Sequence, residues 1–145
     1  MIKLKKLIII FLLTLFIGIL PTIFIKTNLD GLITPFEIPK IMFPIVWTIL
    51  YLLMSITYYV VSNNPNTLKI YLIQLTINSI WTIIFFGLKQ RLLSFLWIIL
   101  LLTIVIIMTI KYYKINNISG YLLIPYIIWL LFAGYLNISI YLLNK

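Results

Sequence analysis

The sequence predicts an all-α integral membrane protein, a single domain built as a bundle of five transmembrane helices. Apolar residues make up 64% of the 145 positions and charged residues only 9%, whereas soluble domains keep about a quarter of their residues charged. The few charges leave five charge-free windows of about 20 residues, the length that a helix needs to cross a bilayer core. Charge, Asn or Pro interrupts the chain between these windows, as expected for solvated turns.

The five helices are expected at residues 7–25, 41–62, 68–88, 92–113 and 119–143. The basic start and apolar run of the first resemble a signal peptide, but no small-residue cleavage site follows, so we expect a retained helix. Pro125 fits either a kink or the start of a helix, because proline removes a backbone donor. The longest connection, residues 26–40, holds both acids, and it fits either a solvated connector or a functional cover.

Several classes of function are excluded by residue types that the chain lacks. It has no Cys and no His, which excludes disulfides, thiol nucleophiles, imidazole catalysis and the usual His ligand of haem. We therefore expect no metal and no cofactor. The charge-free windows argue against ion-coupled transport and against hydrolysis by paired carboxylates. The 11 basic residues are scattered along the chain, a pattern typical of contact with anionic lipid headgroups and not of nucleic-acid binding.

Three of the expected helices carry an aromatic and amide face, because residues at spacings of three, four and seven share one side of a helix. These faces are Trp47, Tyr51, Met54 and Tyr58; Gln74, Asn78, Trp81 and Phe85; and Trp129, Ala133, Leu136 and Ile140, with Asn137 at the margin. Packing would explain the indoles, and hydrogen bonds between helices would explain the two amides of the third helix. A small residue one turn from an indole, as at Ala133, also favours a flat cleft for a planar apolar ligand.

Three segments resemble the motifs of one membrane-protein family. They are IPKIMFPIVWTILYLLM, similar to PPxWVFGPVWTxLYxxMG; IQLTINSIWTIIFFG, similar to QLxLNxxWxxxFFG; and SGYLLIPYIIWLLFAGYLNISIYLLN, similar to AxxLLxPYxxWxxFAxxLNxxxxxLN. The spacing between the segments also fits, and the resemblance runs from about Gly18 to the end. On these motifs the chain is identified as a member of the translocator protein family, also called tryptophan-rich sensory proteins or peripheral-type benzodiazepine receptors.

The resemblance implies a five-helix bundle, often a homodimer, that binds porphyrins, isoquinoline carboxamide or benzodiazepine drugs and, in some members, sterols. The family's ligand cavity lies among the helices under the first loop. Carried over by position, the ligand-binding residues are Trp47, Tyr51, Asn78, Trp129 and Ala133. The family's sterol segment falls on residues 133–145, where Leu136, Tyr141 and Lys145 also fit the loose cholesterol pattern.

The expected function is membrane-embedded binding or sensing of porphyrins and related flat apolar ligands. Porphyrin carboxylates would stay near the interface, close to Lys26 or Lys40. One alternative is light-dependent porphyrin degradation, by a photo-oxidative route through Trp47 or Trp129. The other is facilitated transport of porphyrin or sterol, although no internal repeat is visible. Without an Arg- and Ser-rich transit extension, a bacterial plasma membrane is the expected location.

The chain departs from the family pattern in the first loop and in the fourth helix. The paired prolines are replaced by Ile38 and Pro39, and the tryptophan that follows them is Ile41. An acid common early in the fourth helix is matched by Trp97. We therefore expect a loop that covers the cavity in its own way, and no role for that acid.

Overall fold

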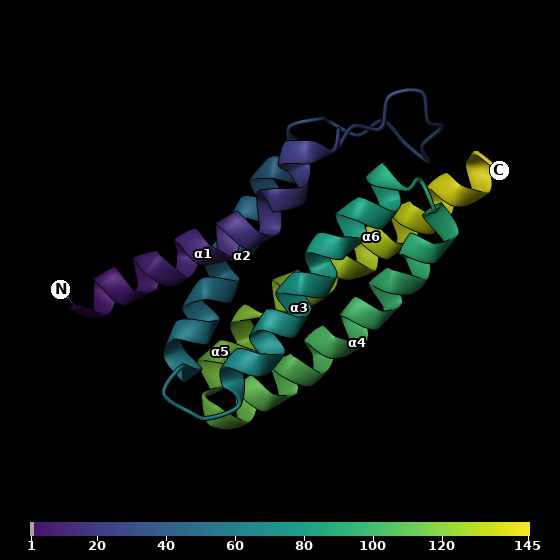
Figure 1. Cartoon of the computed structure of the whole chain (residues 1–145). Coiled ribbons are helices and arrows are strands. Elements are labelled where there is room, and N and C mark those ends of the chain that lie inside the picture. The colour runs from purple at the N-terminus through teal and green to yellow at the C-terminus, as the bar shows by residue number, and fades with distance from the viewer. Residues whose placement is uncertain (1) are drawn as a thin grey trace.

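The computed structural model describes residues 2–145, which are helical apart from short turns and one long loop (Figure 1). In chain order the elements are α1 (Ile2–Phe24), α2 (Met42–Val61), α3 (Thr67–Thr82), the π-helical turn η1 (Ile83–Gly87), α4 (Arg91–Ile115), α5 (Asn117–Leu122) and α6 (Ile124–Leu143). Within this described range, five segments are long and apolar enough to cross a membrane, namely α1, α2, α3 with η1, α4, and α5 with α6. The predicted all-α bundle of five spans is confirmed.

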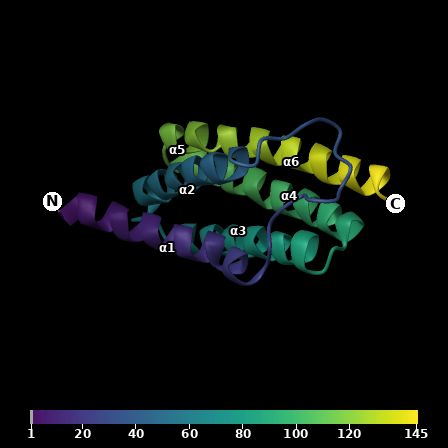
Figure 2. The ribbon, with the colours of Figure 1, turned by 90° about the horizontal axis from the view of Figure 1, so that it is seen from above.

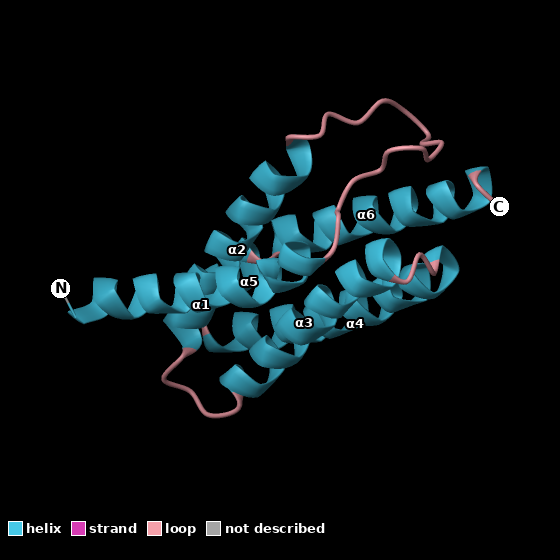
Figure 3. Ribbon diagram, turned by 45° about the horizontal axis from the view of Figure 1, so that its top comes forward, coloured by secondary structure: helices cyan, strands magenta, loops and turns pink. Residues whose placement is uncertain are grey.

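The five spans form a ring that closes at one end only. α1 packs on α2 and α3, α3 packs on α4, α4 packs on α5 and α6, and α2 completes the ring through α5. α2 packs against α5 at one end of the bundle. Toward the other end, where the first loop lies, α2 and α6 move apart (Figures 1 and 3). That loop passes over the open end toward the C-terminus (Figure 2). We call residues 52–75 and 99–126, with the start of α1, the closed half, and residues 16–51, 76–98 and 127–145 the loop half.

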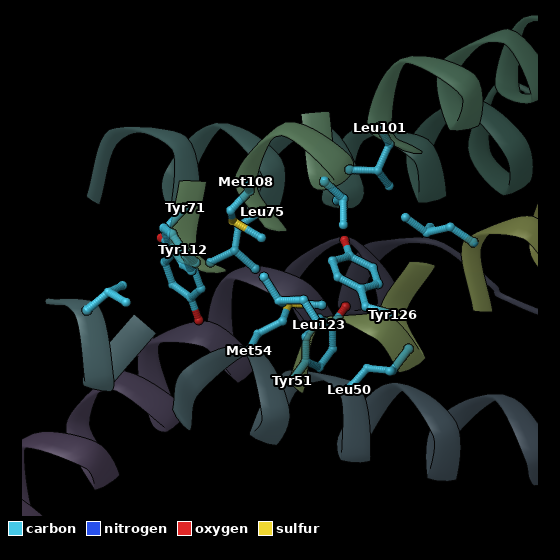
Figure 4. Packing of buried hydrophobic residues seen from close by; sticks show 13 residues of the cluster. Leu50, Tyr51, Met54, Tyr71, Leu75, Leu101, Met108, Tyr112, Leu123 and Tyr126 are labelled. Carbon is cyan, nitrogen blue, oxygen red and sulfur yellow. The ribbon is translucent and has the colours of Figure 1, made fainter. Parts of the chain in front are cut away.

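The larger apolar core lies mainly in the closed half (Figure 4). Met54, Met108 and Tyr112 are completely buried there. Unbranched methionine side chains adapt to irregular gaps between helices. The Tyr112 hydroxyl donates to the backbone carbonyl of Thr67 at 2.8 Å, which satisfies a polar group that lipid would leave unpaired. The spans are thus held together by packing and by internal hydrogen bonds at this end.

The fifth span is two helices, so the prediction of one helix over residues 119–143 was wrong at its start. The Asn116 side chain accepts a hydrogen bond from the Ile118 N–H at 2.9 Å and begins α5. The helix is interrupted at Leu123, and α6 then begins with Pro125 in its first turn. Proline is favoured there because the first N–H groups of a helix have no partner within it. Of the two interpretations of Pro125, the structure supports a helix start.

The first helix begins at Ile2 and not at the predicted residue 7, so α1 includes Lys3, Lys5 and Lys6. Lysine is a good helix former, and its long side chain reaches the polar interface from within a span. Lys6 Nζ donates to the hydroxyl of Ser62 at 2.8 Å, at the end of α2. The remaining helix ends lie within two residues of the predicted ones.

Candidate ligand cavity

A cavity of about 610 Å³ occupies the loop half. Its walls come from α1, α2, α3 with η1 and α6, and the first loop lies across its mouth. The five predicted ligand-binding residues, which come from three different helices, all line it: Trp47, Tyr51, Asn78, Trp129 and Ala133. The cavity lies where α2 and α6 diverge toward the first loop (Figure 3).

Edge-to-face aromatic contacts form one wall of the cavity. The rings of Trp47 and Trp129 lie 6.3 Å apart at 88°, and Phe43 meets Trp129 at 5.9 Å and 70°. Tyr51 packs against Trp47 at 5.6 Å. The two edge-to-face pairs at Trp129 are favourable beyond their buried area, because the positive edge of one ring meets the negative face of the other. The contacts hold the indoles in defined orientations and leave apolar ring surface facing the cavity.

A second wall contains Trp81 and an amide that the sequence placed only at the margin. Trp81 Nε1 donates to Asn137 Oδ1 at 3.0 Å, and Asn137 Nδ2 donates to the Arg91 carbonyl at 2.8 Å. The π-helical turn that follows brings Phe85 and Phe86 against Trp81, with ring centroids at 5.1 and 6.0 Å. Asn137 therefore positions Trp81, a role that a face plot of one helix does not reveal.

The two amides predicted on the third helix form a buried chain of hydrogen bonds. Gln74 Nε2 lies 3.7 Å from Met54 Sδ, the Tyr126 hydroxyl donates to Gln74 Oε1 at 2.9 Å, and Asn78 Nδ2 donates to the Tyr126 hydroxyl at 2.9 Å. The chain joins α2, α3 and α6, as expected of hydrogen bonds between helices. Asn78 also lines the cavity, so the two interpretations of this residue are compatible. The buried Tyr126 was missed, since its hydroxyl has no signature in the sequence.

Gly18 of α1 is a further cavity residue that sequence reasoning did not select. A Cβ at this position would overlap the Tyr51 ring. Only glycine lets α1 approach the α2 face closely enough for Tyr51 to remain in the wall. A lone glycine in a helix otherwise rich in Ile and Leu was the available signal.

The first loop covers the mouth and is attached to Asn144, the residue that follows α6. The backbone of Ile33 and the side chain of Asn144 exchange two hydrogen bonds, both of 2.8 Å. Ile38, at the altered proline pair, lines the cavity, whereas Ile41 is 68% exposed at the start of α2. Lys40 pairs with Asp30 at 3.4 Å; both side chains are exposed, so this pair contributes little to stability.

The remaining predicted residues lie at different places. Leu136 lines the cavity, but Tyr141 and Lys145 do not, because they fall on other faces of α6 and beyond its end. Lys40 lines the mouth and Lys26 does not. Trp97 lies behind the wall, where its Nε1 donates to the Ile77 carbonyl at 2.8 Å.

Comparison with known families decides the identity of this fold. A family model described as the TspO/MBR family matches residues 7–143, a range that contains the three aromatic faces and nearly all of the five spans. The chain belongs to the TspO/MBR family. The resemblance inferred from the three motifs is confirmed, and the five apolar helices of this family member are those of an integral membrane protein.

Named relatives of this TspO/MBR chain come from bacteria and an archaeon. "Tryptophan-rich protein TspO" of Archaeoglobus fulgidus is 37% identical over 126 residues, which cover 83% of this chain and 82% of the relative. "Protein CrtK" of Rhodobacter capsulatus is 35% identical over 113 residues, or 73% and 71%. "Tryptophan-rich sensory protein" of Cereibacter sphaeroides is 33% identical over 110 residues, or 73% and 69%.

Proposed function

We propose that this membrane protein binds porphyrins and related flat apolar ligands in the cavity of the loop half, as a binding or sensing protein of a bacterial plasma membrane. The observation that carries the proposal is the cavity of about 610 Å³ with Trp47, Trp81 and Trp129 in its walls. Its volume falls within the range of about 300–1,000 Å³ that is typical of small-molecule sites. Indole walls favour planar ligands, because ring faces stack on one another.

The polar groups of the cavity favour a ligand with one or two polar positions. Trp47, Tyr51, Asn78 and Trp129 line the cavity, and the indole nitrogen of Trp129 is buried there without a hydrogen-bond partner within residues 2–145. A few convergent polar groups in an apolar pocket are what orients a ligand. Sterols and aromatic carboxamide or benzodiazepine drugs share this character, so they are included in the proposed ligand class.

The charges at the mouth bear on how a porphyrin would be oriented. Its apolar ring fits the interior, and its carboxylates would remain at the loop end, near the headgroups. Lys40 lies there, but so do Asp30 and Glu37. The mouth is thus not a cationic site, and burial of the ring, more than charge pairing, supports binding.

Titration of protoporphyrin into the protein in lipid nanodiscs tests the proposal, with tryptophan fluorescence as the readout. We expect saturable quenching in the wild type, and a loss of affinity of at least tenfold in Trp129→Leu and Ala133→Phe, which remove ring surface or fill the cavity. Leu131→Phe is the control: it adds a phenyl ring to α6, as Ala133→Phe does, but at an exposed position. It should bind protoporphyrin like the wild type. Equal affinity in all four proteins would place the ligand elsewhere.

Light-dependent porphyrin degradation is a second candidate, favoured by one observation. The two indoles proposed for a photo-oxidative route, Trp47 and Trp129, are in edge-to-face contact in the cavity wall. Dioxygen would be the oxidant, and product formation under light is the readout. If a Trp47→Phe/Trp129→Phe protein bleaches bound protoporphyrin as fast as the wild type, degradation does not proceed through this pair.

A further inference from the structure

We propose that the cavity has a second opening, between α1 and α2, through which uncharged ligands dissolved in the bilayer enter it sideways. This inference rests on the proposed function, because it concerns access to the same cavity. The opening, which we call the side portal, is bordered by two cavity-lining residues on each helix: Ile19, Thr22, Pro44 and Thr48. Ligands that take this route do not pass the charged loop over the mouth.

The exposure of these four residues reveals the side portal. They line the cavity and are nevertheless exposed at the surface of the molecule, Ile19 to 45%. Every other lining residue that the helices contribute is buried or half-buried. Both pairs belong to segments long and apolar enough to cross a membrane, so the surface that they expose faces lipid. The cavity therefore reaches the lipid-facing side of the bundle between α1 and α2.

The seam between α1 and α2 is closed on the side of the closed half. Lys6 Nζ donates to the hydroxyl of Ser62 at its far end, and Gly18 lies directly against the Tyr51 ring. Beyond Gly18, toward the first loop, the two helices separate (Figures 2 and 3). The contact between Gly18 and Tyr51 is thus the floor of the side portal.

The neighbouring seams of the loop half are closed by direct contacts. Between α1 and α3, Ser79 Oγ donates to the Ile17 carbonyl at 2.7 Å. Between α2 and α6, the Trp129 ring meets Phe43 at 5.9 Å and Trp47 at 6.3 Å. The seam between α1 and α2 differs from both, since lining residues of both its helices remain exposed.

The chemistry of the side portal suits an uncharged ligand. The Thr22 hydroxyl donates to the Ile19 carbonyl, and the Thr48 hydroxyl donates to the Pro44 carbonyl at 2.7 Å. Both hydroxyl protons are therefore used within their own helices, and the border carries no charged side chain. A carboxylate that passed here would leave water without a partner, which is costly in an apolar medium.

The mouth under the first loop has the opposite character. Asp30, Glu37 and Lys40 lie there, and the loop is held down by the hydrogen bonds between Ile33 and Asn144. Charged groups stay hydrated at this end. The two openings thus sort ligands by charge: the dianionic protoporphyrin passes under the loop, and uncharged ligands pass through the side portal.

Protoporphyrin and its uncharged dimethyl ester are a matched pair for the test. Relaxation of tryptophan fluorescence after a small temperature jump gives both rate constants in proteoliposomes that already contain the ligand. Thr48→Phe places a ring in the side portal, so association and dissociation of the ester should both slow about fivefold, with the affinity kept within about twofold. An obstacle on the route raises the barrier equally in both directions.

Matched controls place the same ring on the same helices outside the side portal. Ile49→Phe and Ile23→Phe change residues that are 53% and 64% exposed and do not line the cavity, so the ester should keep its wild-type rates. Thr22→Phe blocks the opposite border and should slow the ester as Thr48→Phe does. Protoporphyrin should keep its rates in all four variants, whereas Asn144→Ala should accelerate protoporphyrin and leave the ester unchanged.

The outcomes separate this inference from the proposed function. Slower exchange of the ester in Thr48→Phe and Thr22→Phe, with its affinity kept and both controls at wild-type rates, supports the side portal. Wild-type ester rates in both portal variants overturn it and leave the cavity as a binding site. Equal slowing of protoporphyrin overturns the sorting by charge. Failure of the wild type to bind either porphyrin overturns both proposals.

Discussion

The two halves of this bundle are built from the same residue types with opposite results. In the closed half, Tyr58 and Tyr71 stack at 4.7 Å, and the Tyr71 hydroxyl lies 2.6 Å from Thr14 Oγ1. In the loop half of the same α2, Trp47 and Tyr51 face a cavity. The difference lies in what stands opposite α2. α5 packs against it in the closed half, whereas α6 diverges from it in the loop half (Figure 3).

The comparison shows that aromatic content alone does not create a binding site. Rings that meet a neighbouring helix interdigitate to near-crystalline density, and rings that meet a diverging helix line a cavity.

The difference between the two halves also bears on transport. The buried side chains of the closed half, fully enclosed at Met54 and Met108, stand between the cavity and the other membrane surface. Passage of a porphyrin would require this half to separate, which liposome flux measurements would detect.

The largest expected effect is a loss of stability when the core of the closed half is disrupted. Tyr112→Ala removes a completely buried ring and its hydrogen bond to Thr67, and should lower the free energy of unfolding by about 3 kcal/mol or more. Unfolding in mixed SDS micelles measures it. Trp129→Ala should cost less stability, because one side of that indole already faces the cavity, yet it should weaken protoporphyrin binding more. Equal stability losses would contradict the division into two halves.

The next largest effect is expected at Gly18, where a larger side chain should fill part of the cavity of the loop half. Gly18→Ala places a methyl group in the position of the Tyr51 ring, so this ring, which lines the cavity together with Gly18, has to shift. We expect protoporphyrin affinity to fall roughly tenfold, equivalent to 1.4 kcal/mol. Gly134→Ala is the matched control, because its methyl group would lie 3.5 Å from Ile98 Cγ2, an ordinary contact. An equal loss in both variants would mean that the close α1–α2 approach is unimportant.

A smaller effect concerns the cover of the loop half. Asn144→Ala removes both hydrogen bonds to Ile33, which contribute about 1 kcal/mol together at this exposed position. Ligand dissociation, followed by stopped-flow fluorescence, should accelerate about fivefold, with little change in unfolding. The Ile33 amide should also exchange hydrogen faster. Unchanged dissociation would show that the loop does not limit escape.

The smallest effect lies at the mouth. Glu37→Gln removes one of the two acids that line the cavity together with Lys40, so the affinity for the dianionic protoporphyrin should rise about twofold at low salt. The gain should vanish at high salt, because exposed charges are screened. A neutral protoporphyrin diester should bind both proteins equally. A gain that persists in high salt would indicate a packing effect of the substitution instead.

The sequence by itself determined the spans and their faces. Both depend on local rules: a bilayer sets the length of an apolar window, and helical periodicity brings Trp47 and Tyr51, or Trp129 and Ala133, to one side. The family motifs then indicated that these faces share one cavity. The same local rules predicted a single fifth helix and failed at Leu123, where α5 ends and α6 begins with proline in its first turn.

Only the tertiary structure decided what stands opposite each face. Asn144 reaches Ile33 across 111 positions, Trp81 reaches Asn137 across 56, and Tyr126 reaches Gln74 across 52. The direction of a hydrogen bond depends on both partners and on their own neighbours, so no pattern within one helix contains it. The divergence of α2 from α6 is likewise a property of the whole ring. It turns three aromatic faces into a cavity, where tighter packing of the same helices would have made a core.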